Sequence, residues 1–258
     1  MNQPPIVHYS LGVTNDVMFD LITARLSKES HVVDFGAGHG HMSQRIGGFF
    51  ERQGCDPAGR LTPCDITPEI FQYQAVSCRK IGMNSGIPVE DGSQDLIYAI
   101  EVIEHLARPY DFFLEASAKL KPGGNLIFST PNLLNMKSRF QYFFTGYQEM
   151  FGPPSVEDRN AGRLCGHIMP LSYPYFVYGL RRAGFDGMEF HSDRLKRSAM
   201  FMALLLYPLL LLGSWVISRR LRKADEEVWH EIKSLIWRVN RLDVLASRSC
   251  IVVARKLA

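Results

Sequence analysis

Residues 31–46 read HVVDFGAGHGHMSQRI, and this stretch decides the fold. A β-branched run ends at Asp34, glycines follow at alternate positions, and a helical pattern begins after them. This order predicts a strand, a tight turn and a helix. Glycines let a ligand approach the backbone, and amides at the start of the next helix can point toward it. Because glycine turns also serve only to reverse a chain, the pattern alone leaves both interpretations open.

Strands and helices alternate along the rest of the chain. Strands are predicted at RLTPCD (60–65), QDLIYAIE (94–101), NLIFST (125–130), AGFDGMEFHS (183–192) and SCIVVARK (249–256). Helices are predicted at 15–26, capped by Asn15 or Asp16, and at 109–120, 136–144 and 172–183. We expect the helix at 109–120 to stop at KPGG, since Pro122 and two glycines cannot continue it. Such alternation predicts an α/β fold of Rossmann-like, doubly wound and mainly parallel type, with seven strands and its ligand at their carboxyl edge.

The length of 258 residues fits one domain with additions. We interpret residues 1–258 as a single domain that contains two additions. Residues 133–170 are irregular and rich in glycine and proline near FGPPS, and we interpret them as a substrate lid. Residues 193–247, between the last two strands, form a hydrophobic and amphipathic helical insertion.

The net charge of +3 is unevenly distributed. Seven basic residues flank the most apolar stretch: Arg194, Lys196, Arg197, Arg219, Arg220, Arg222 and Lys223. Without them the rest of the chain has a net charge of −4, which is a poor nucleic-acid surface. Basic clusters that bracket an apolar run suit anionic lipid head groups, although a solvated charged surface is the alternative. We therefore expect an anionic lipid surface and no nucleic acid as partners.

The five cysteines include no CxxC pair and are odd in number. This usage indicates neither a zinc site nor a disulfide framework, and it favours reduced thiols in a cytosol. His39 and His41 in the glycine turn have no carboxylate spaced with them, so we predict no metal ligands there. The start of the chain lacks the apolar run of a secretory signal, so we expect no such signal.

Four ordered motifs carry a resemblance to a known family. VVDFGAGHGHMS, PCDITPE, IPVEDGSQDLIYAIEVIEHL and LKPGGNLIFSTPN resemble the class I S-adenosylmethionine-dependent methyltransferases, especially the branch with ubiquinone-type and sugar O-methyltransferases. The resemblance covers residues 30–132, with weaker similarity in GHIMPLSYPYFVYGLRRAGF and CIVVARK. It implies an enzyme whose cofactor is S-adenosyl-L-methionine.

The resemblance also implies a set of cofactor-binding residues. By position they are Asp34, Gly36, Ala37, Gly38, Gly40, Asp65, Ile66, Asn84 and Glu101. Asp34 and the glycines would hold the methionine part of the cofactor, with Glu101 lining the same side. Asp65 would hold the ribose, and Ile66 would pack on the adenine. Relatives carry an acid near Met83 for the adenine amine, whereas this chain offers the amide oxygen of Asn84.

Methyl transfer to a hydroxyl needs a positioned acceptor and a base. Histidine suits the role of base near neutral pH. The resemblance places active-site histidines at His105 and His167, and both are predicted to be catalytic. The alternatives are a cofactor-shaping or capping role for His105 and a hydrogen bond at the start of a helix for His167. Asp158 and Arg159 in the lid are candidate contacts to a sugar or phosphate, or belong to a solvated loop.

The stretch between Arg197 and Arg219 contains no charged residue. As a straight helix it is roughly 30 Å long, close to the hydrocarbon thickness of a bilayer. Because the strands on either side should be neighbours in one sheet, a single crossing is disfavoured, and basic residues on both flanks agree. Pro208 should kink or break the helix. The stretch therefore favours monotopic or in-plane attachment, with an amphipathic second helix carrying Trp229 and Trp237.

These observations predict a peripheral or monotopic enzyme at the cytoplasmic face of the inner membrane. The leading interpretation is O-methylation of a sugar hydroxyl on a lipid-linked glycan, such as a surface polysaccharide or lipopolysaccharide precursor. A quinone-type phenol is the alternative acceptor, and a non-catalytic membrane-anchored scaffold that binds the cofactor is the alternative from another class. The alternative for the helical stretch at 199–245 is a buried antiparallel pair of helices or a homodimer interface.

Overall fold

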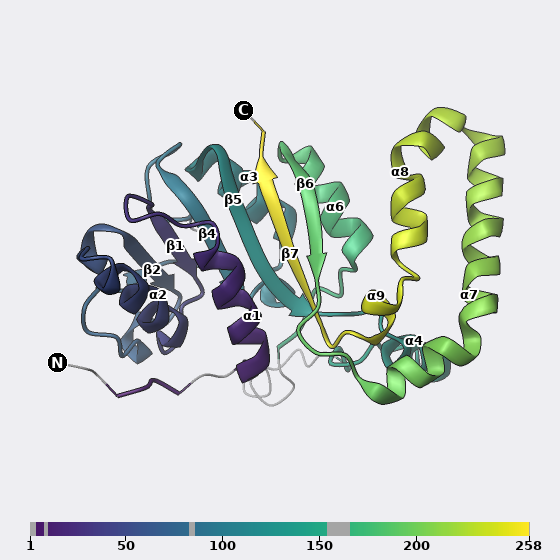
Figure 1. Ribbon diagram of the computed structural model, residues 1–258, viewed down its shortest axis with the longest axis horizontal. Helices are drawn as coiled ribbons and strands as arrows, with labels where there is room; N and C mark the ends of the chain where they lie inside the picture. Colours follow the sequence, from purple (N-terminus) through teal and green to yellow (C-terminus); the bar gives the residue numbers. More distant parts are fainter. Residues whose placement is uncertain (1–3, 8–9, 83–85, 154–165, 258) are drawn as a thin grey trace. The chain divides into compact units, whose positions relative to one another are not determined.

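The computed structural model describes residues 4–7, 10–82, 86–153 and 166–257. The chain divides into two compact units (Figure 1). Unit 1 contains Met1–Thr130, Val177–His191 and Ile251–Ala258. Unit 2 contains Pro131–Phe176 and Ser192–Cys250. The segments interpreted from the sequence as lid and insertion therefore both belong to unit 2.

A seven-stranded sheet has the order β3-β2-β1-β4-β5-β7-β6. Its strands are β1 (Val32–Phe35), β2 (Leu61–Asp65), β3 (Arg79–Lys80), β4 (Gln94–Ile100), β5 (Leu120–Pro131), β6 (Phe185–His191) and β7 (Ser249–Lys256). The pairs from β3 through β5 are parallel, whereas β6 and β7 are antiparallel. The predicted α/β, mainly parallel seven-stranded fold is confirmed.

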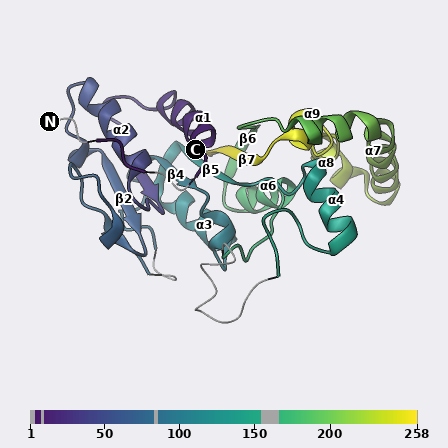
Figure 2. The ribbon, with the colours of Figure 1, turned by 90° about the horizontal axis from the view of Figure 1, so that it is seen from below.

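Helices flank this sheet in unit 1. They are α1 (Gly12–Thr23), α2 (His41–Arg52), α3 (Pro109–Lys119) and the last part of α6 (Tyr173–Arg182). Short 3₁₀ turns occur at Pro57–Gly59, Pro68–Ile70 and Ile103–His105. Figure 2 shows α1 and α2 on one side of the sheet and α3 on the other. Helices on both faces bury most residues of β1, β2, β4 and β7, which explains the nearly continuous apolar runs of these strands.

Alternation along each strand distributes side chains between the two faces. Leu96 and Tyr98 of β4 pack in one core with residues of α1 and α2. On the other face, the ring of Phe35 lies 4.7 Å from that of Phe112 on α3. Asp34, between Val33 and Phe35, therefore faces α2 rather than α3.

Two local expectations are wrong. The first helix begins at Gly12, before the predicted caps, and Asn15 is buried inside it. The helix α3 ends at Lys119, before KPGG, as predicted, but β5 starts at Leu120 rather than at the predicted residue 125 and so includes KPGG. A positive φ of 79° at Gly123 lets the strand accommodate this segment.

Unit 2 is helical apart from the ends of its strands. It contains α4 (Met136–Thr145), α7 (Arg197–Ala224), α8 (Glu226–Arg238) and α9 (Leu242–Ala246). Its core gathers Met136, Ala199, Ala203, Leu245 and Ala246. Small residues on α7 let its backbone lie close to α9.

α7 continues through Pro208, so of the two expected outcomes, a kink or a break, the break does not occur. The helix does bend along its length in Figure 1, as a proline inside a helix is expected to cause. After the bend, α7 runs beside α8 (Figure 1).

A polar network connects three helical segments of unit 2. Arg139 of α4 donates to the side-chain oxygen of Asn240 at 2.7 Å and to the backbone oxygen of Val239 at 2.7 Å. Asn240 in turn donates to the hydroxyl of Ser214 on α7 at 2.8 Å. Burial lowers the pKa of Arg139 to about 10. Because each group has a partner, the network fixes how α4, α7 and α8 meet.

One face of α7 remains uncovered. Among the described residues, α7 alone is long and apolar enough to cross a membrane, and only 11% of its most apolar window is buried. The exposed side chains of this face are Phe201, Leu204, Leu205, Leu209 and Leu212, which we call the α7 apolar face. At 100° per residue these positions fall within an arc of about 140°, so they form one continuous stripe.

Candidate active site

The strand order reverses between β1 and β4. From β1 the chain proceeds outward through β2 and β3, and it returns on the other side through β4 and β5. In sheets of this kind, ligands bind at the carboxyl ends of the two strands where the order reverses. The glycine turn follows β1 at this point, and the Ile103–His105 turn follows β4.

A cavity of about 340 Å³ occupies this position in unit 1. Its lining residues are Val7, Ser10, Asn15, Asp34, Gly36, Ala37, Gly38, His39, His41, Met42, Ile100, Glu101, Val102 and His105. The volume lies in the range of small-molecule sites, about 300–1,000 Å³. Of the predicted site residues, the cavity brings together Asp34, the first glycines, Glu101 and His105.

Asp34 is the buried acid of the cavity. The hydroxyl of Ser43 donates to its Oδ2 at 2.6 Å, and register pairs Asp34 with Tyr98 of β4. The pKa of Asp34 is raised to about 6, mainly by burial. Hydrogen bonds with the hydroxyls of Ser43 and Tyr98 lower the pKa, and the nearby charge of Asp65 raises it. A cationic ligand group at this carboxylate would relieve that destabilisation, so the site favours an amine.

The glycine turn supplies space rather than hydrogen-bond donors. The amides of Gly36 and Ala37 donate to the Cys64 carbonyl at 2.9 and 3.1 Å. The amide of Gly38 donates to Asp65 Oδ2 at 2.8 Å. The end of β2 already occupies these three amides, so any amide donated to the ligand would come from the first turn of α2, and that expectation stays a prediction.

Replacing Gly36 with alanine is expected to destabilise the protein by more than the same change at Gly54. Both glycines have positive φ, 78° and 75°, so both substitutions strain the backbone. Only at Gly36 would the added Cβ collide, 2.5 Å from a methyl of Val102. Urea unfolding should show a loss of about 1 kcal/mol for Gly54→Ala and at least twice that for Gly36→Ala. Equal losses of stability in the two variants would contradict the close approach of Gly36 to Val102.

Comparison with known proteins identifies the family. The family model described as "Methyltransferase domain" matches residues 15–177, which is more than half of the chain. The chain belongs to the methyltransferase domain family. The predicted class I methyltransferase resemblance is thus confirmed for family and fold, and α7 and α8 lie outside the matched residues.

Curated relatives match the same part of this methyltransferase-family chain. A malonyl-[acyl-carrier protein] O-methyltransferase of Hahella chejuensis is 30% identical over 128 residues, 46% of this chain and 43% of the relative. A ubiquinone biosynthesis O-methyltransferase of Xylella fastidiosa is 31% identical over 136 residues, 47% of this chain and 50% of the relative. The match thus spans about half the length of these relatives.

Solved structures of methyltransferases share the fold. A SAM-dependent methyltransferase from Archaeoglobus fulgidus aligns with a TM-score of 0.55 and 14% identity, covering 96% of this chain and 95% of that chain. A phosphoethanolamine N-methyltransferase 2 of Haemonchus contortus, solved with S-adenosylhomocysteine, aligns with a TM-score of 0.51 and 12% identity, covering 96% and 54%. At these identities the likeness shows the fold alone.

The remaining predicted cofactor residues differ in what the structure says of them. Asp65 ends β2 and is not among the cavity-lining residues; its Oδ1 accepts from the Thr67 amide at 2.8 Å. A carboxylate has lone pairs for further donors, so its predicted contact with a ribose stays a prediction. Ile66 is exposed beside it. Gly40, with a φ of 89°, ends the turn before α2, whereas Asn84 lies outside the described residues.

Glu101 follows β4 in a backbone conformation that is uncommon for a residue with a side chain. Its φ is 53°, and its amide donates to the backbone and hydroxyl oxygens of Ser129, each at 3.1 Å. The Ser129 hydroxyl donates to Glu101 Oε1 at 2.9 Å. Such strain persists only where surrounding contacts enforce it, and it concentrates at functional sites. Ser129 therefore fixes a carboxylate at the cavity wall.

Glu104 is a second carboxyl on the turn after β4. Its side chain is buried, and burial, followed by the charge of Glu101, raises its pKa to about 8. At neutral pH Glu104 is therefore mostly protonated and can donate a hydrogen bond.

Replacing Glu104 with glutamine is expected to reduce the loss of stability between pH 6 and pH 8. The raised pKa means that the folded state holds a proton that the unfolded chain loses above pH 4.5. The stabilisation that this proton gives to the folded state is complete below pH 4.5 and is lost as pH rises through about 8. The Glu104→Gln variant lacks the titration, so its free energy of unfolding, measured with urea, should fall less over this range. Parallel pH dependence in the two proteins would contradict the burial of this carboxyl.

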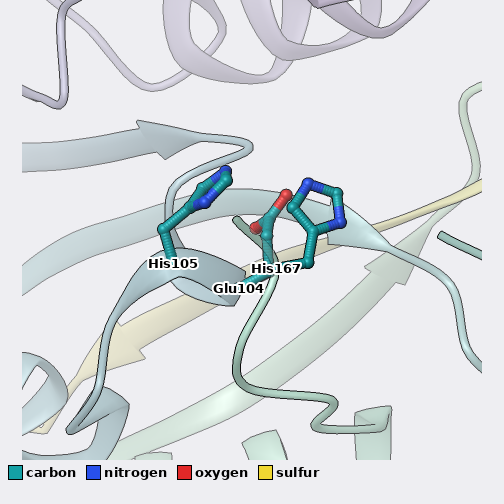
Figure 3. Close-up of side chains that lie close together, drawn as sticks. All are labelled: Glu104, His105 and His167. Atoms are coloured by element: carbon teal, nitrogen blue, oxygen red, sulfur yellow. The ribbon is translucent and has the colours of Figure 1, made fainter. Parts of the chain in front are cut away.

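The two predicted catalytic histidines lie in different units. Figure 3 shows Glu104 and His105 extending from the turn after β4, and His105 lines the cavity of unit 1. His167 belongs to unit 2, where its Nδ1 lies 2.9 Å from the Met150 carbonyl oxygen and its ring packs 5.2 Å from that of Phe151. Their roles as bases stay predictions. Asp158 and Arg159 lie outside the described residues.

Sequence reasoning missed four residues that shape the cavity. They are Ser43, Tyr98, Ser129 and Glu104. Ser43 could have been found, because a residue in the first turn of α2 faces back toward the end of β1. Glu104 is marked by its place three residues after Glu101. Tyr98 and Ser129 depend on pairing between strands far apart in sequence.

Proposed function

We propose that this protein is an S-adenosylmethionine-dependent O-methyltransferase that works at the membrane surface on a sugar hydroxyl of a lipid-linked glycan. Family membership and the cavity at the reversal of strand order support methyl transfer. The observation that carries the membrane location is the α7 apolar face, which the rest of unit 2 leaves uncovered.

The cavity fits the cofactor. S-adenosylmethionine, when bound, supplies a methyl group on a positively charged sulfur together with an amino-acid end and a nucleoside. Asp34 would accept hydrogen bonds from the amine, and Glu101 would lie on the same side, held by Ser129. Gly36 and Gly38 keep the wall of the cavity free of side chains. The Asp65 carboxylate has lone pairs left for the ribose hydroxyls, so the ribose would bind there without breaking an existing hydrogen bond.

The acceptor hydroxyl needs a group that takes its proton. His105 is a base of the right kind at the cavity wall, and Glu104 beside it stays mostly neutral at pH 7. His167 is the second candidate from unit 2.

The α7 apolar face is better suited to lying on a membrane than to crossing it. α8 runs beside α7 and exposes Glu227, Glu231 and Lys233. A charged residue in the centre of a bilayer costs about 2.5–3.5 kcal/mol, so the helix pair would not enter the hydrocarbon as a unit. Lateral contact buries the apolar face and leaves α8 in water. We place the protein at the cytoplasmic face of the inner membrane as a peripheral or monotopic enzyme.

Two kinds of membrane-held acceptor fit this location. A sugar hydroxyl of a lipid-linked glycan is the first candidate, because the basic residues that flank α7 suit an acceptor held at an anionic lipid surface. A quinone-type phenol would need an apolar site, but the ubiquinone O-methyltransferases among the relatives keep it as the second candidate.

The decisive experiment offers both acceptors at once. The full chain is incubated with cofactor labelled at the methyl group and with separated lipid-linked glycan and quinone fractions. We expect label in the glycan fraction, and it should resist mild alkali, because alkali cleaves methyl esters but leaves methyl ethers intact. Label in the quinone fraction would select the second candidate. Cofactor binding without label in either fraction would leave only the non-catalytic scaffold.

Replacing His105 or His167 with alanine is expected to lower turnover about 100-fold or more while cofactor affinity changes little. A general base contributes about 10²–10⁴-fold to a reaction of this kind. His230, which is exposed on α8, provides a matched control for loss of a histidine. Near-normal rates in both variants on the true acceptor would show that neither is the base.

A further inference from the structure

A second cavity lies between α7 and α8, near the connection of the two helices in unit 2. It measures about 530 Å³ and is lined by Trp215, Ser218, Arg219, Arg222, Lys223, Glu226 and Trp229. We call it the α7–α8 cleft. It lies outside the residues that the family model matches.

The α7–α8 cleft is positively charged. Three basic side chains line it against one carboxylate, and Glu226 pairs with Arg222 at 3.1 Å. In the part of the chain that the structure describes, neither Arg219 nor Lys223 has a carboxylate within 4.0 Å. The cleft therefore holds cationic groups that are available to an anionic ligand.

Tryptophan rings orient the cations of the cleft. The guanidinium of Arg219 lies 5.4 Å from the centre of the Trp215 ring. Arg222 lies 5.0 Å from the Trp229 ring, whose Nε1 donates to the Ser218 hydroxyl at 2.7 Å. Packing on fixed rings reduces the freedom that a guanidinium loses when it binds. Planar guanidinium groups held in this way match the oxygens of a phosphate.

The cleft also continues the α7 apolar face. Trp215 follows Leu212 by three positions and precedes Arg219 by four, so all three lie on one side of the helix. An apolar stripe that ends in a cluster of cations and tryptophans matches a molecule with a hydrocarbon chain attached to a phosphate.

We propose that the α7–α8 cleft binds the phosphate group of a membrane amphiphile, with the hydrocarbon chain along the α7 apolar face. Two sources share this chemistry: the phosphodiester head group of an anionic lipid, and the phosphate that links a polyprenyl chain to a glycan. The inference rests on the proposed membrane location but not on methyl transfer, so it is tested by binding alone.

The test uses vesicles and a variant that keeps every charge. The full chain is mixed with vesicles of phosphatidylcholine, of phosphatidylcholine with phosphatidylglycerol, and of phosphatidylcholine with polyprenyl phosphate. Wild-type protein is compared with a double variant, Arg219→Lys and Arg222→Lys, by sedimentation and tryptophan fluorescence. Lysine preserves the charge but lacks the planar fork, so a built site loses affinity whereas diffuse attraction does not.

We expect at least tenfold tighter binding to one of the two anionic vesicles than to zwitterionic phosphatidylcholine alone, and a tenfold loss in the double variant. The vesicle type that shows the loss identifies the source of the phosphate. A second variant with Lys28, Arg52 and Lys80 changed to glutamine removes three exposed positive charges from unit 1 and should bind normally. Equal binding to all vesicles, or unchanged binding in the lysine variant, would overturn the proposal. The methylation experiment can still succeed or fail independently.

Discussion

Replacing Asp34 with asparagine is expected to weaken binding of S-adenosylmethionine on the order of 100-fold. The variant keeps the size of the side chain but cannot offer a negative charge to the cofactor amine. Hydrogen bonds to charged groups contribute about 1.5–3 kcal/mol, and a tenfold change in affinity corresponds to about 1.4 kcal/mol. Isothermal titration calorimetry measures the effect directly. Asp91→Asn, which removes an exposed carboxylate that does not line the cavity, is the matched control.

The pH dependence of binding gives the same prediction a second readout. Because the pKa of Asp34 is raised to about 6, wild-type affinity should be highest near pH 7 and fall as pH drops through 6 toward 5. In the Asp34→Asn variant this fall should disappear.

The stability of the cofactor-free wild-type protein should fall as pH rises, whereas its affinity for the cofactor should increase. The raised pKa means that Asp34 contributes stability below its ordinary pKa of 3.8, and this contribution is lost as pH rises through about 6. A rise of this size in the pKa corresponds to roughly 3 kcal/mol, so the cofactor-free variant should be no less stable at pH 7. A variant that unfolds more easily and binds normally would contradict the assignment of Asp34.

Changing Leu205, Leu209 and Leu212 together to glutamine is expected to release the protein from membranes. These side chains are 70%, 65% and 53% exposed, so they lose water contact only when something covers α7. Burial of an exposed leucine contributes about 1.5–3 kcal/mol, and three partly exposed ones together about 3 kcal/mol or more. The vesicle partition coefficient should therefore fall roughly 100-fold or more.

The control for this variant replaces exposed apolar residues of unit 1. Val13, Leu114 and Leu257 have comparable exposure, and changing all three to glutamine should leave membrane binding intact. Analytical ultracentrifugation of both triple variants decides the alternative interpretation of the stretch. A wild-type dimer that the α7 variant converts to monomer, with no membrane binding in either protein, would show that the apolar face joins two copies of the chain.

Local sequence patterns predicted the strand, turn and helix around Asp34 because each depends on neighbouring residues. The glycine turn requires positive φ at Gly36, Gly38 and Gly40, and only glycine adopts it without strain. The neighbouring positions of the last two strands were also predictable, since two short apolar runs flank the insertion.

Features that arise from contacts between distant segments could not be predicted from local sequence patterns. The position of Tyr98 against Asp34 follows from the register of β1 and β4, which no local pattern specifies. The burial of Glu104 follows from the packing around its turn. For Pro208 the local pattern predicted a kink or a break of α7, and the helix bends without ending.

The pairing of His191 with Ile251 has a practical consequence. Residues 192–248 leave the sheet after β6 and return to it at the start of the neighbouring strand β7. In topological terms, this whole segment replaces the tip of a β-hairpin. A segment inserted at such a position can differ in length and composition without changing the order or pairing of the strands.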